Sequence, residues 1–346
     1  MQDINPYFSV VIPMYNRARF IARALNSCLS QDFTDFEIIV VDDGSSDGSA
    51  DVVRGCTDSR VKLVCHEMNR GVCPARNTGV AAASGEWVVY LDSDDELLPG
   101  ALATMHRRMS EVSSAVGKVC FMCRLDSGEL TPQPPLKDEI WDYVAYLRWT
   151  EAHANSISET LPCVRRTTFQ SVRCPDDRMW NSIYHYDLAT FFLTRACPDV
   201  VRLFHSDAED RLTSPSTSRA LRNAPDRLRG TEEILARHGD AFSKWAPTVL
   251  LGHLAKLATL YFLRGQRLQG LRYALRGMRR SPASPKFYAI VALGLLGPGA
   301  LVSIQAAKQS FSRARAWEQR GPVDALLRTF VHWCSTSRSV WGRSRT

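Results

Sequence analysis

The sequence lacks the usual marks of an exported or disulfide-bonded protein. Its first residues, Met1 to Pro6, contain neither the basic stretch nor the apolar run of a secretory signal. Ten cysteines occur among 346 residues, but they are scattered through a long chain. Cys120 and Cys123 form a CxxC pair with no second pair at zinc spacing, which argues against a zinc site. We therefore expect reduced cysteines and a cytoplasmic protein.

Acidic residues are scarce at the C-terminal end. Residues 1–230 carry 25 Lys and Arg against 31 Asp and Glu, whereas residues 231–346 carry 18 against 5. The net charge of +7 therefore belongs to one end of the chain. We find no recognised nucleic-acid-binding motif there and expect no nucleic-acid partner. Because the same region holds long apolar segments, an anionic membrane surface fits better, although the charges could also form a solvated helix face.

Short apolar runs alternate with helical patterns through the first part of the chain. This order predicts an α/β protein with a mostly parallel sheet flanked by helices. In such sheets, ligands bind outside the carboxyl ends of the strands. The predicted strands are 8–13, 36–41, 61–65 and 87–91, and the predicted helices are 17–30, 49–54 and 74–83.

Carboxylates follow directly on the last of these apolar runs. Residues 88–96 read Val-Val-Tyr-Leu-Asp-Ser-Asp-Asp-Glu. Carboxylates this close repel one another unless a positive charge lies among them, and a divalent cation holding a phosphate-bearing ligand would supply one. Polar clusters also follow the first two strands, at Tyr15-Asn16 and Asp42-Asp43. We expect these segments to converge on one crevice.

Several other interpretations lack their main support. Residues 43–48 mimic an EF-hand loop, but Arg54 stands where the loop needs a Glu. No Gly-x-Gly-x-x-Gly follows the first strand, which argues against a dinucleotide-binding site. Residues 11–16 lack the Gly-rich basic loop of a nucleotidyltransferase. By itself, an Asp-rich loop after a strand is as often a solvated turn or a helix cap.

Four segments in order resemble the inverting family-two glycosyltransferases with a GT-A fold. They are Val-Val-Ile-Pro-Met-Tyr-Asn at 10–16, Ile-Ile-Val-Val-Asp-Asp-Gly-Ser-Ser-Asp-Gly at 38–48, the segment 69–77, and 85–95. The resemblance implies a GT-A catalytic domain over 1–222. A basic helical region, associated with a membrane or not, would then occupy 223–346.

The resemblance also implies how a nucleotide-sugar donor would bind. The backbone around Pro13 and Tyr15 would line the slot for the base, and Asp43 would accept a hydrogen bond from it. Arg76 would lie near the diphosphate or the base, with a structural ion pair as an equal alternative.

A metal site is implied by the Asp-x-Asp motif of residues 92–94. Asp92 and Ser93 would contact the nucleoside, and Asp94, together with Asp92, would hold Mn²⁺ or Mg²⁺. A bound cation would stabilise the negative charge that the leaving nucleoside diphosphate gains.

An inverting transferase also needs a base for the acceptor hydroxyl. The resemblance places it at Asp187, with Asp176, Asp177 or a helix-capping role for Asp187 as alternatives. Tyr186 stands where the family has Glu, and Cys-Pro at 174–175 replaces its Gly-Phe. His205 could approach the metal or phosphates, but a structural role is favoured.

The rest of the chain is predicted as mixed structure followed by helices. A helix should run from residue 99 to Met109. Strand and loop should follow over 118–136, an amphipathic segment over 139–150, a helix over 182–196, a linker over 206–226 and helices over 231–282, with a hairpin at 257–278. Residues 287–307 are uncharged and broken by Gly-Pro-Gly at 297–299. They predict two short helices, in a core or on a membrane, rather than one spanning helix.

Together these features predict a metal-dependent transferase at the inner face of the plasma membrane. It would move a hexosyl or N-acetylhexosaminyl group from a nucleotide-diphosphate donor, a UDP-sugar, to a saccharide or lipid-linked saccharide in surface polysaccharide synthesis. The alternative is a nucleotide-sugar-binding scaffold without turnover, which the departure at Tyr186 would explain.

Overall fold

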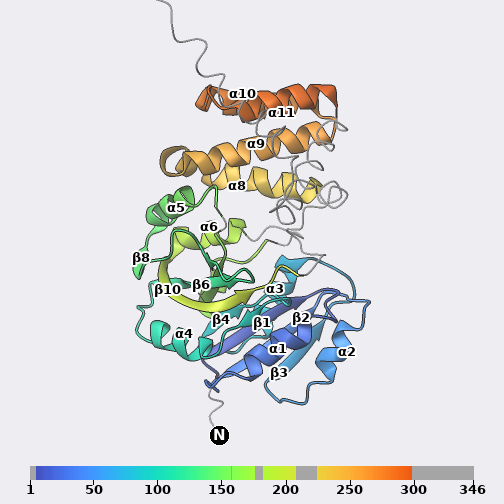
Figure 1. Cartoon of the computed structure of the whole chain (residues 1–346), viewed down its shortest axis with the longest axis vertical. Coiled ribbons are helices and arrows are strands. Elements are labelled where there is room, and N and C mark those ends of the chain that lie inside the picture. The colour runs from blue at the N-terminus through green and yellow to red at the C-terminus, as the bar shows by residue number, and fades with distance from the viewer. Residues whose placement is uncertain (1–4, 157, 176–181, 208–223, 298–346) are drawn as a thin grey trace, which may run out of the picture.

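The computed structural model describes residues 5–156, 158–175, 182–207 and 224–297. A mixed sheet with flanking helices fills the lower part of Figure 1, and a stack of helices lies above it. The predicted linker falls mostly outside the described residues, as does the predicted domain boundary at 222.

The parallel half of the sheet confirms the four predicted strands. They are β1 (Phe8–Met14), β2 (Phe36–Asp42), β3 (Val61–Cys65) and β4 (Trp87–Tyr90), and they lie side by side in the order β3-β2-β1-β4. β1 pairs in parallel with β2 on one side and with β4 on the other. The chain therefore reverses its direction of winding at β1, and in open α/β sheets ligands bind at such a point, beyond the carboxyl ends of the strands.

The other half of the sheet is mixed and was predicted less well. β4 pairs antiparallel with β9 (Thr160–Arg165), and β6 (Val116–Leu125) lies between β9 and β10 (Leu193–Phe204). The predicted helix over 182–196 is wrong beyond α6 (Ser182–Phe191), because the chain there enters β10. Short strands complete the sheet at β5 (Glu96–Leu97), β7 (Leu130–Thr131) and β8 (Glu139–Trp141).

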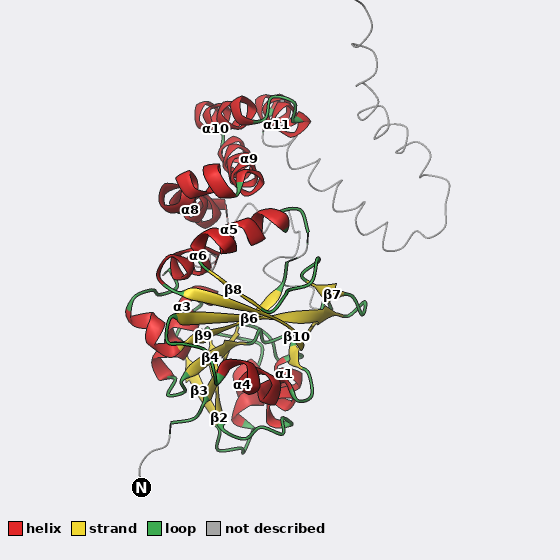
Figure 2. Cartoon of the chain, turned by 90° about the vertical axis from the view of Figure 1, so that its left-hand side faces the viewer, coloured by secondary structure: helices red, strands yellow, loops and turns green. Residues whose placement is uncertain are grey.

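Helices cover both faces of the parallel strands, as Figure 2 shows. On one face, α1 (Ile21–Leu29) and α4 (Ala101–Met109) pack on alternate residues of β1, β2 and β4. On the other face, α3 (Val72–Ala82) and α6 pack on the intervening residues. The short α2 (Ser49–Arg54) lies between β2 and β3 in the chain. Burial on both faces of β1, β2 and β4 explains why these three strands read as mostly apolar runs.

The C-terminal helices rest on the sheet through α6 and α5 (Tyr143–Ala152), which lie between the sheet and α8 (Ala224–Trp245) in Figure 2. The predicted hairpin is confirmed: α9 (Pro247–Leu263) turns at Gly265 into α10 (Arg267–Arg280). α11 (Pro285–Leu296) follows, and the rest of the uncharged segment lies outside the described residues. Among the helices that are described, none is both long and apolar enough to cross a membrane.

Candidate functional site

The predicted donor-binding residues come from the ends of three neighbouring parallel strands. Pro13 is buried on β1 opposite Val41 of β2, and Tyr15 follows β1 with 44% of its surface exposed. Asp43 directly follows β2, and Asp92 follows β4 after one intervening residue, Leu91. Because β1 lies between β2 and β4, the topology brings these segments to one edge of the sheet.

Asp43 is buried and anchors the loop that leads into α3. Its carboxylate accepts hydrogen bonds from the backbone N–H groups of Arg70 (2.9 Å) and Gly71 (2.7 Å). Its Oδ1 also lies 2.7 Å from Nδ1 of His66, whose Nε2 lies 2.9 Å from the hydroxyl of Thr78. Asp43 therefore has a structural role in addition to its predicted contact with the base of the nucleotide.

The Asp-x-Asp motif forms a tight turn after β4. The backbone N–H of Asp95 donates to the carbonyl of Asp92 (3.1 Å), which closes the turn. The Asp92 side chain is 40% exposed, whereas Asp94 is 10% exposed, and Ser93 is buried. Asp95 is fully buried, and burial raises the pKa of its carboxyl, a rise that the nearby Arg202 guanidinium opposes. Among the carboxylates of residues 92–96, that of Asp92 is therefore the most exposed.

Guanidinium groups from three different elements surround this turn. Arg76 of α3 lies 3.2 Å from Oδ1 of Asp92, and Arg202 of β10 lies 3.8 Å from Oδ2 of the same carboxylate. Arg17 follows β1 and lies 4.0 Å from Asp94. The Nε atom of Arg76 is buried without a hydrogen-bond partner in the described structure. The turn thus combines carboxylates with cationic donors suited to phosphate.

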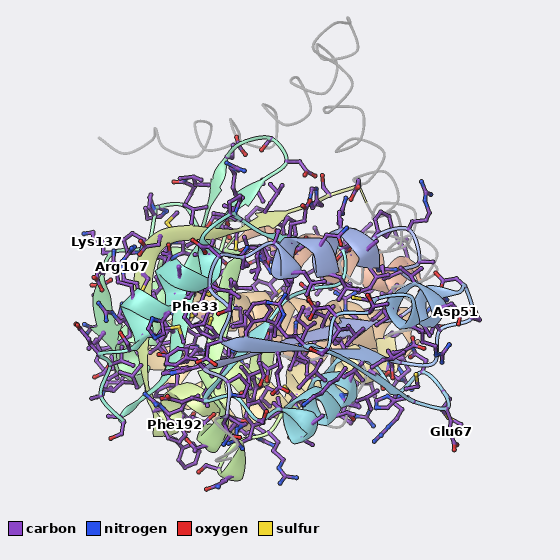
Figure 3. All side chains as sticks on the ribbon, turned by 90° about the horizontal axis from the view of Figure 1, so that it is seen from below. Phe33, Asp51, Glu67, Arg107, Lys137 and Phe192 are labelled. Atoms are coloured by element: carbon purple, nitrogen blue, oxygen red, sulfur yellow. The ribbon has the colours of Figure 1, made fainter. Side chains whose placement is uncertain are left out.

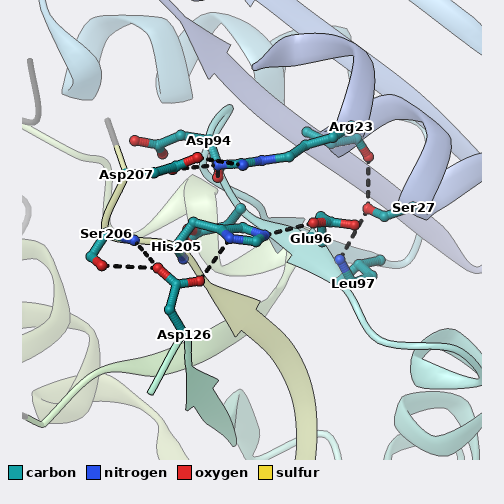
Figure 4. A network of polar contacts seen from close by, with 11 residues as sticks. Arg23, Ser27, Asp94, Glu96, Leu97, Asp126, His205, Ser206 and Asp207 are labelled. Atoms are coloured by element: carbon teal, nitrogen blue, oxygen red, sulfur yellow. Dashed lines mark hydrogen bonds and ion pairs between the residues drawn. The ribbon is translucent and has the colours of Figure 1, made fainter. Parts of the chain in front are cut away.

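His205 is held in a separate polar network, which Figure 4 shows. Its Nε2 lies 2.6 Å from Glu96 and its Nδ1 lies 2.8 Å from Asp126. Beside it, Arg23 bonds the backbone carbonyl of Asp94 and pairs with Asp207 at 2.8 Å. Both ring nitrogens of His205 are therefore occupied by carboxylates, which supports the structural role favoured from sequence.

The carboxylates of this turn could hold a divalent cation only if a bound ligand supplied further oxygen atoms to it. No cluster of three or more His, Cys, Asp or Glu able to hold a metal occurs in the part of the chain that the structure describes. Asp92 and Asp94 nevertheless supply two carboxylates from one turn. Mg²⁺-type sites commonly use one or two carboxylates and complete their shell with substrate phosphates and water. The residues therefore fit a cation that arrives with a diphosphate.

The predicted base, Asp187, lies on α6 and faces the C-terminal helices. Its Oδ2 is 2.6 Å from Arg237, and its Oδ1 is 3.0 Å from Nε2 of His238, both on α8. Asp176 and Asp177, the alternatives, lie outside the described residues. No contact joins Asp187 to the Asp92–Asp94 turn among the interactions of the described side chains.

An open hollow of about 360 Å³ lies beside the end of β2. Its lining comes from the end of β2, from α2 and from the end of β3, and includes Asp42, Ser45 and His66. Asp51 and Glu67 mark this side of the molecule in Figure 3, far from Arg107 and Lys137. The hollow adjoins the Asp43 loop on the side of α2.

Arg202 and His185 were not singled out from the sequence. Arg202 lies on β10, where no strand was predicted, and it is buried with Asp92, Asp95 and Glu159 around it. A lone arginine in the apolar run at 200–204 was the signal that could have found it. His185, two residues before Asp187, received no role from the sequence.

Comparison with known proteins identifies the N-terminal part of the chain. Residues 9–163 match the model of the family described as glycosyl transferase family 2. This part of the chain belongs to that family. The family 2 segment includes Pro13, Tyr15, Asp43, Arg76 and the Asp92–Asp94 turn, but it ends before α6. The resemblance inferred from the four sequence segments is thereby confirmed.

Curated relatives match the same segment. The succinoglycan biosynthesis protein ExoO of Rhizobium meliloti is 40% identical over 124 residues, which are 36% of this chain and 34% of that protein. A GalNAc(5)-diNAcBac-PP-undecaprenol beta-1,3-glucosyltransferase of Campylobacter jejuni is 42% identical over 120 residues, 34% of this chain and 39% of that protein. The matched segment thus spans little more than a third of each relative.

Solved structures share the fold beyond the family 2 segment. S. aureus TarS, in complex with UDP-GlcNAc, has a TM-score of 0.54 at 17% identity, covering 89% of this chain and 91% of that one. The mannosyltransferase PcManGT of Pyrobaculum calidifontis, in complex with GDP-Man and Mn²⁺, has a TM-score of 0.51 at 20% identity, covering 90% and 88%. The predicted GT-A fold with a helical C-terminal region is confirmed.

Proposed function

We propose that this chain transfers a sugar from a nucleotide-diphosphate donor, a UDP-sugar, to a hydroxyl group of a saccharide or lipid-linked saccharide. The observation that carries the proposal is the meeting of Asp43, Arg76 and the Asp92–Asp94 turn at one sheet edge, within a family 2 segment. A crevice with an acidic turn and neighbouring guanidinium groups suits a diphosphate bound with a cation.

The donor would lie across the ends of β1, β2 and β4. Pro13 and Tyr15 would line the slot for the base, and Asp43 would accept a hydrogen bond from it while also holding residues 70 and 71. Arg76 would donate to the diphosphate through Nε, which has no partner within the described chain. Ser93 and Asp92 would contact the nucleoside.

Asp94 and Asp92 are the residues that would hold Mn²⁺ or Mg²⁺. When bound, the cation would offset the charge that develops on the departing diphosphate. Support comes from the donor set of the turn and from the fold neighbour solved with GDP-Man and Mn²⁺. The group transferred would be a hexosyl or an N-acetylhexosaminyl group.

Transfer would proceed by in-line attack of the acceptor oxygen on the anomeric carbon, with inversion. The attacking hydroxyl must lose its proton, so a base is required on the acceptor side of the crevice. Asp187 was predicted for this task, but its carboxylate already has two partners on α8.

The acceptor and the cellular location are inferred from the names of the relatives and from the surface of α10. One relative is named for an undecaprenol-linked substrate and another for succinoglycan synthesis, and we propose surface polysaccharide synthesis at the inner face of the plasma membrane. α10 exposes four arginines with helical spacing, together with Leu268 (85% exposed) and Leu275. The arginines are Arg272, Arg276, Arg279 and Arg280. Such a face suits an anionic lipid surface.

Vesicle sedimentation tests the membrane part of the proposal. Each basic residue near an anionic surface contributes about 1 kcal/mol, so the double variant Arg272→Glu/Arg276→Glu should bind phosphatidylglycerol vesicles roughly tenfold or more weakly than wild type. Arg107→Glu, on the distant α4, is the matched control. Equal binding of all three proteins, or none at all, would contradict docking through α10.

Donor binding and turnover test the catalytic part. UDP and a panel of UDP-sugars should raise the unfolding temperature, and Mn²⁺ should increase that shift. The right donor should also be slowly hydrolysed, with release of UDP. Asp94→Asn should lose the effect of Mn²⁺, whereas the exposed Asp51→Asn should behave as wild type. Tight UDP binding without UDP release from any donor would favour the scaffold without turnover.

A further inference from the structure

A buried positive charge lies beside the acidic turn that follows β4. Arg202 of β10 is 2% exposed, and its Nη1 lies 3.5 Å from Oδ2 of Asp95 and 3.8 Å from Oδ2 of Asp92. Both distances are those of ion pairs. One nitrogen atom therefore pairs with the first and with the last residue of the turn, which the backbone bond from Asp95 to Asp92 also closes.

The pairing of β10 brings Arg202 to this turn. Arg202 stands opposite Leu97 of β5, the short strand that begins directly after the turn. The register with β6 shifts between Val200 and Arg202, and irregularities of this kind can re-aim a side chain. Farther along β10, the backbone N–H of His205 donates to Oδ1 of Asp95 (3.0 Å). The end of β10 therefore contacts the turn at two of its residues.

The rest of the Arg202 guanidinium is fixed by other neighbours. Its Nε donates to Sγ of Cys123 on β6 (3.2 Å), and its Nη2 lies 3.4 Å from Oε2 of Glu159. Its Cζ lies 5.3 Å from the centre of the Phe204 ring. Because arginine is not deprotonated in proteins, these contacts hold a permanent positive charge next to the turn.

The exposed carboxylate of Asp92 is paired at both of its oxygens. Arg76 of α3 lies 3.2 Å from Oδ1, and Arg202 lies 3.8 Å from Oδ2. The side chain is still 40% exposed, so this pairing does not close it off from solvent. Asp92 and Asp95 would repel each other without a cation between them. The chain's own Arg202 supplies a positive charge at the place where the sequence suggested a divalent cation.

We propose that Arg202 is a positioning residue for donor binding, which holds the carboxylate of Asp92 in the orientation that contacts the nucleoside. The inference rests on the proposed function, in which Asp92 makes that contact. Arg202 is too deeply buried to contact the donor itself, so its effect on UDP passes through Asp92. Its pair with Asp95 serves the fold, because loss of Arg202 alone would leave a buried carboxylate without its cation.

Variants of the full chain that carry Asp95→Asn separate positioning from folding. With Asp95 neutral, Arg202→Met leaves no unpaired charge in the interior. Compared with Asp95→Asn alone, Arg202→Met/Asp95→Asn should bind UDP about tenfold more weakly in titration calorimetry with Mn²⁺, within the range of coupling between neighbouring charged groups. Arg202→Lys/Asp95→Asn should bind within about threefold of Asp95→Asn, because its ammonium keeps the positive charge.

Addition of Asp92→Asn tests whether the effect passes through Asp92. At UDP concentrations that saturate these weaker binders, the loss caused by Arg202→Met should shrink from about tenfold to less than about twofold once Asp92 is neutral. A residue that only supports the fold would weaken binding equally with either residue at position 92. Arg195→Met is the matched control, because Arg195 also lies on β10 but pairs with Asp138. It should bind UDP as wild type does.

The outcomes separate this inference from the function on which it rests. Equal UDP affinity of Asp95→Asn and Arg202→Met/Asp95→Asn would overturn the role of Arg202, and so would a loss that persists in full with Asp92→Asn. A lysine variant that binds as weakly as the methionine variant would also overturn it, since the charge would then not matter. Each of these results leaves the proposed function standing. A wild-type chain that binds no UDP would overturn both.

Discussion

The guanidinium of Arg76 lies 3.2 Å from the carboxylate of Asp92 and stacks above the ring of Tyr90. This contact joins α3 to the end of β4 and leaves Nε of Arg76 without a partner in the described structure. If that atom serves the diphosphate, Arg76→Ala should weaken UDP binding about 10- to 100-fold, the usual value of a lost charge-assisted hydrogen bond. Titration calorimetry in the presence of Mn²⁺ would measure it.

An alanine variant of a second arginine tests whether the loss of UDP affinity in Arg76→Ala comes only from the loss of one positive charge. Arg229 pairs with Asp226 on α8 and is exposed, so Arg229→Ala should bind UDP as wild type does. If Arg76→Ala lowered the unfolding temperature but left UDP affinity unchanged, Arg76 would be only the structural ion-pair partner that the sequence left open.

Asp43 and His66 allow the two tasks of the buried carboxylate to be measured separately. In Asp43→Asn the side-chain amide would face two backbone N–H donors, so stability and UDP affinity should both fall, affinity by about tenfold or more. His66→Ala removes one partner of Asp43 but keeps the carboxylate. We expect His66→Ala to lose stability with little change in affinity for UDP. Equal losses of affinity in both variants would mean that Asp43 acts only by shaping the loop.

The parallel strands could be predicted from sequence because both of their faces are covered. Residues 38–41 are apolar throughout, and polar residues begin where the strand ends. The helix after residue 182 could be predicted, but its end could not. Residues 188–193 are apolar except for Thr190, and apolar residues return at Val200. Only the pairing of β10 with β6 decides that the second part is a strand.

The direction of each side chain on α6 could not be predicted for a related reason. A helix with one apolar stripe shows which side faces the core, and a polar residue opposite that stripe faces water. α6 is apolar on both sides because it lies between two cores. Sequence therefore indicated an ionisable group on this helix, but not that Asp187 contacts Arg237 and His238 of α8.

Gly79 brings α3 close to β1, and this contact predicts a measurable coupling. A Cβ atom at Gly79 would lie 2.3 Å from Cγ1 of Val11. Although Ala favours a helix by about 1 kcal/mol, the overlap should make Gly79→Ala destabilising by about 1–3 kcal/mol. In the double variant with Val11→Ala, the cost should be lower than the sum of the single costs by about 1 kcal/mol. Additive costs in urea denaturation would show that the helix shifts freely.

The side chain of Glu37 on β2 is bonded to residues of β1, of β3 and of the loop that follows α3. It accepts hydrogen bonds from the hydroxyls of Ser9 and Ser84 and from the backbone N–H of Ser84, each at 2.7 Å. Nζ of Lys62 on β3 donates to its other oxygen at 2.7 Å. Burial alone would raise the pKa of Glu37, but the bonds from Lys62, Ser84 and Ser9 outweigh it and lower the pKa to about 2.

This lowered pKa makes the contribution of Glu37 to stability depend on pH in a definite direction. The folded state holds the carboxylate more strongly than the unfolded chain, whose pKa is near 4.5. The contribution is therefore complete above about pH 5 and is lost as the pH falls toward 2. At pH 7, Glu37→Gln should cost about 2 kcal/mol, discounted for the half-exposed Lys62. The difference from wild type should narrow steadily below pH 5 in urea denaturation, while the exposed Glu67→Gln should show no such trend. A difference that stays constant down to pH 3 would mean that Glu37 acts through shape and not through its charge.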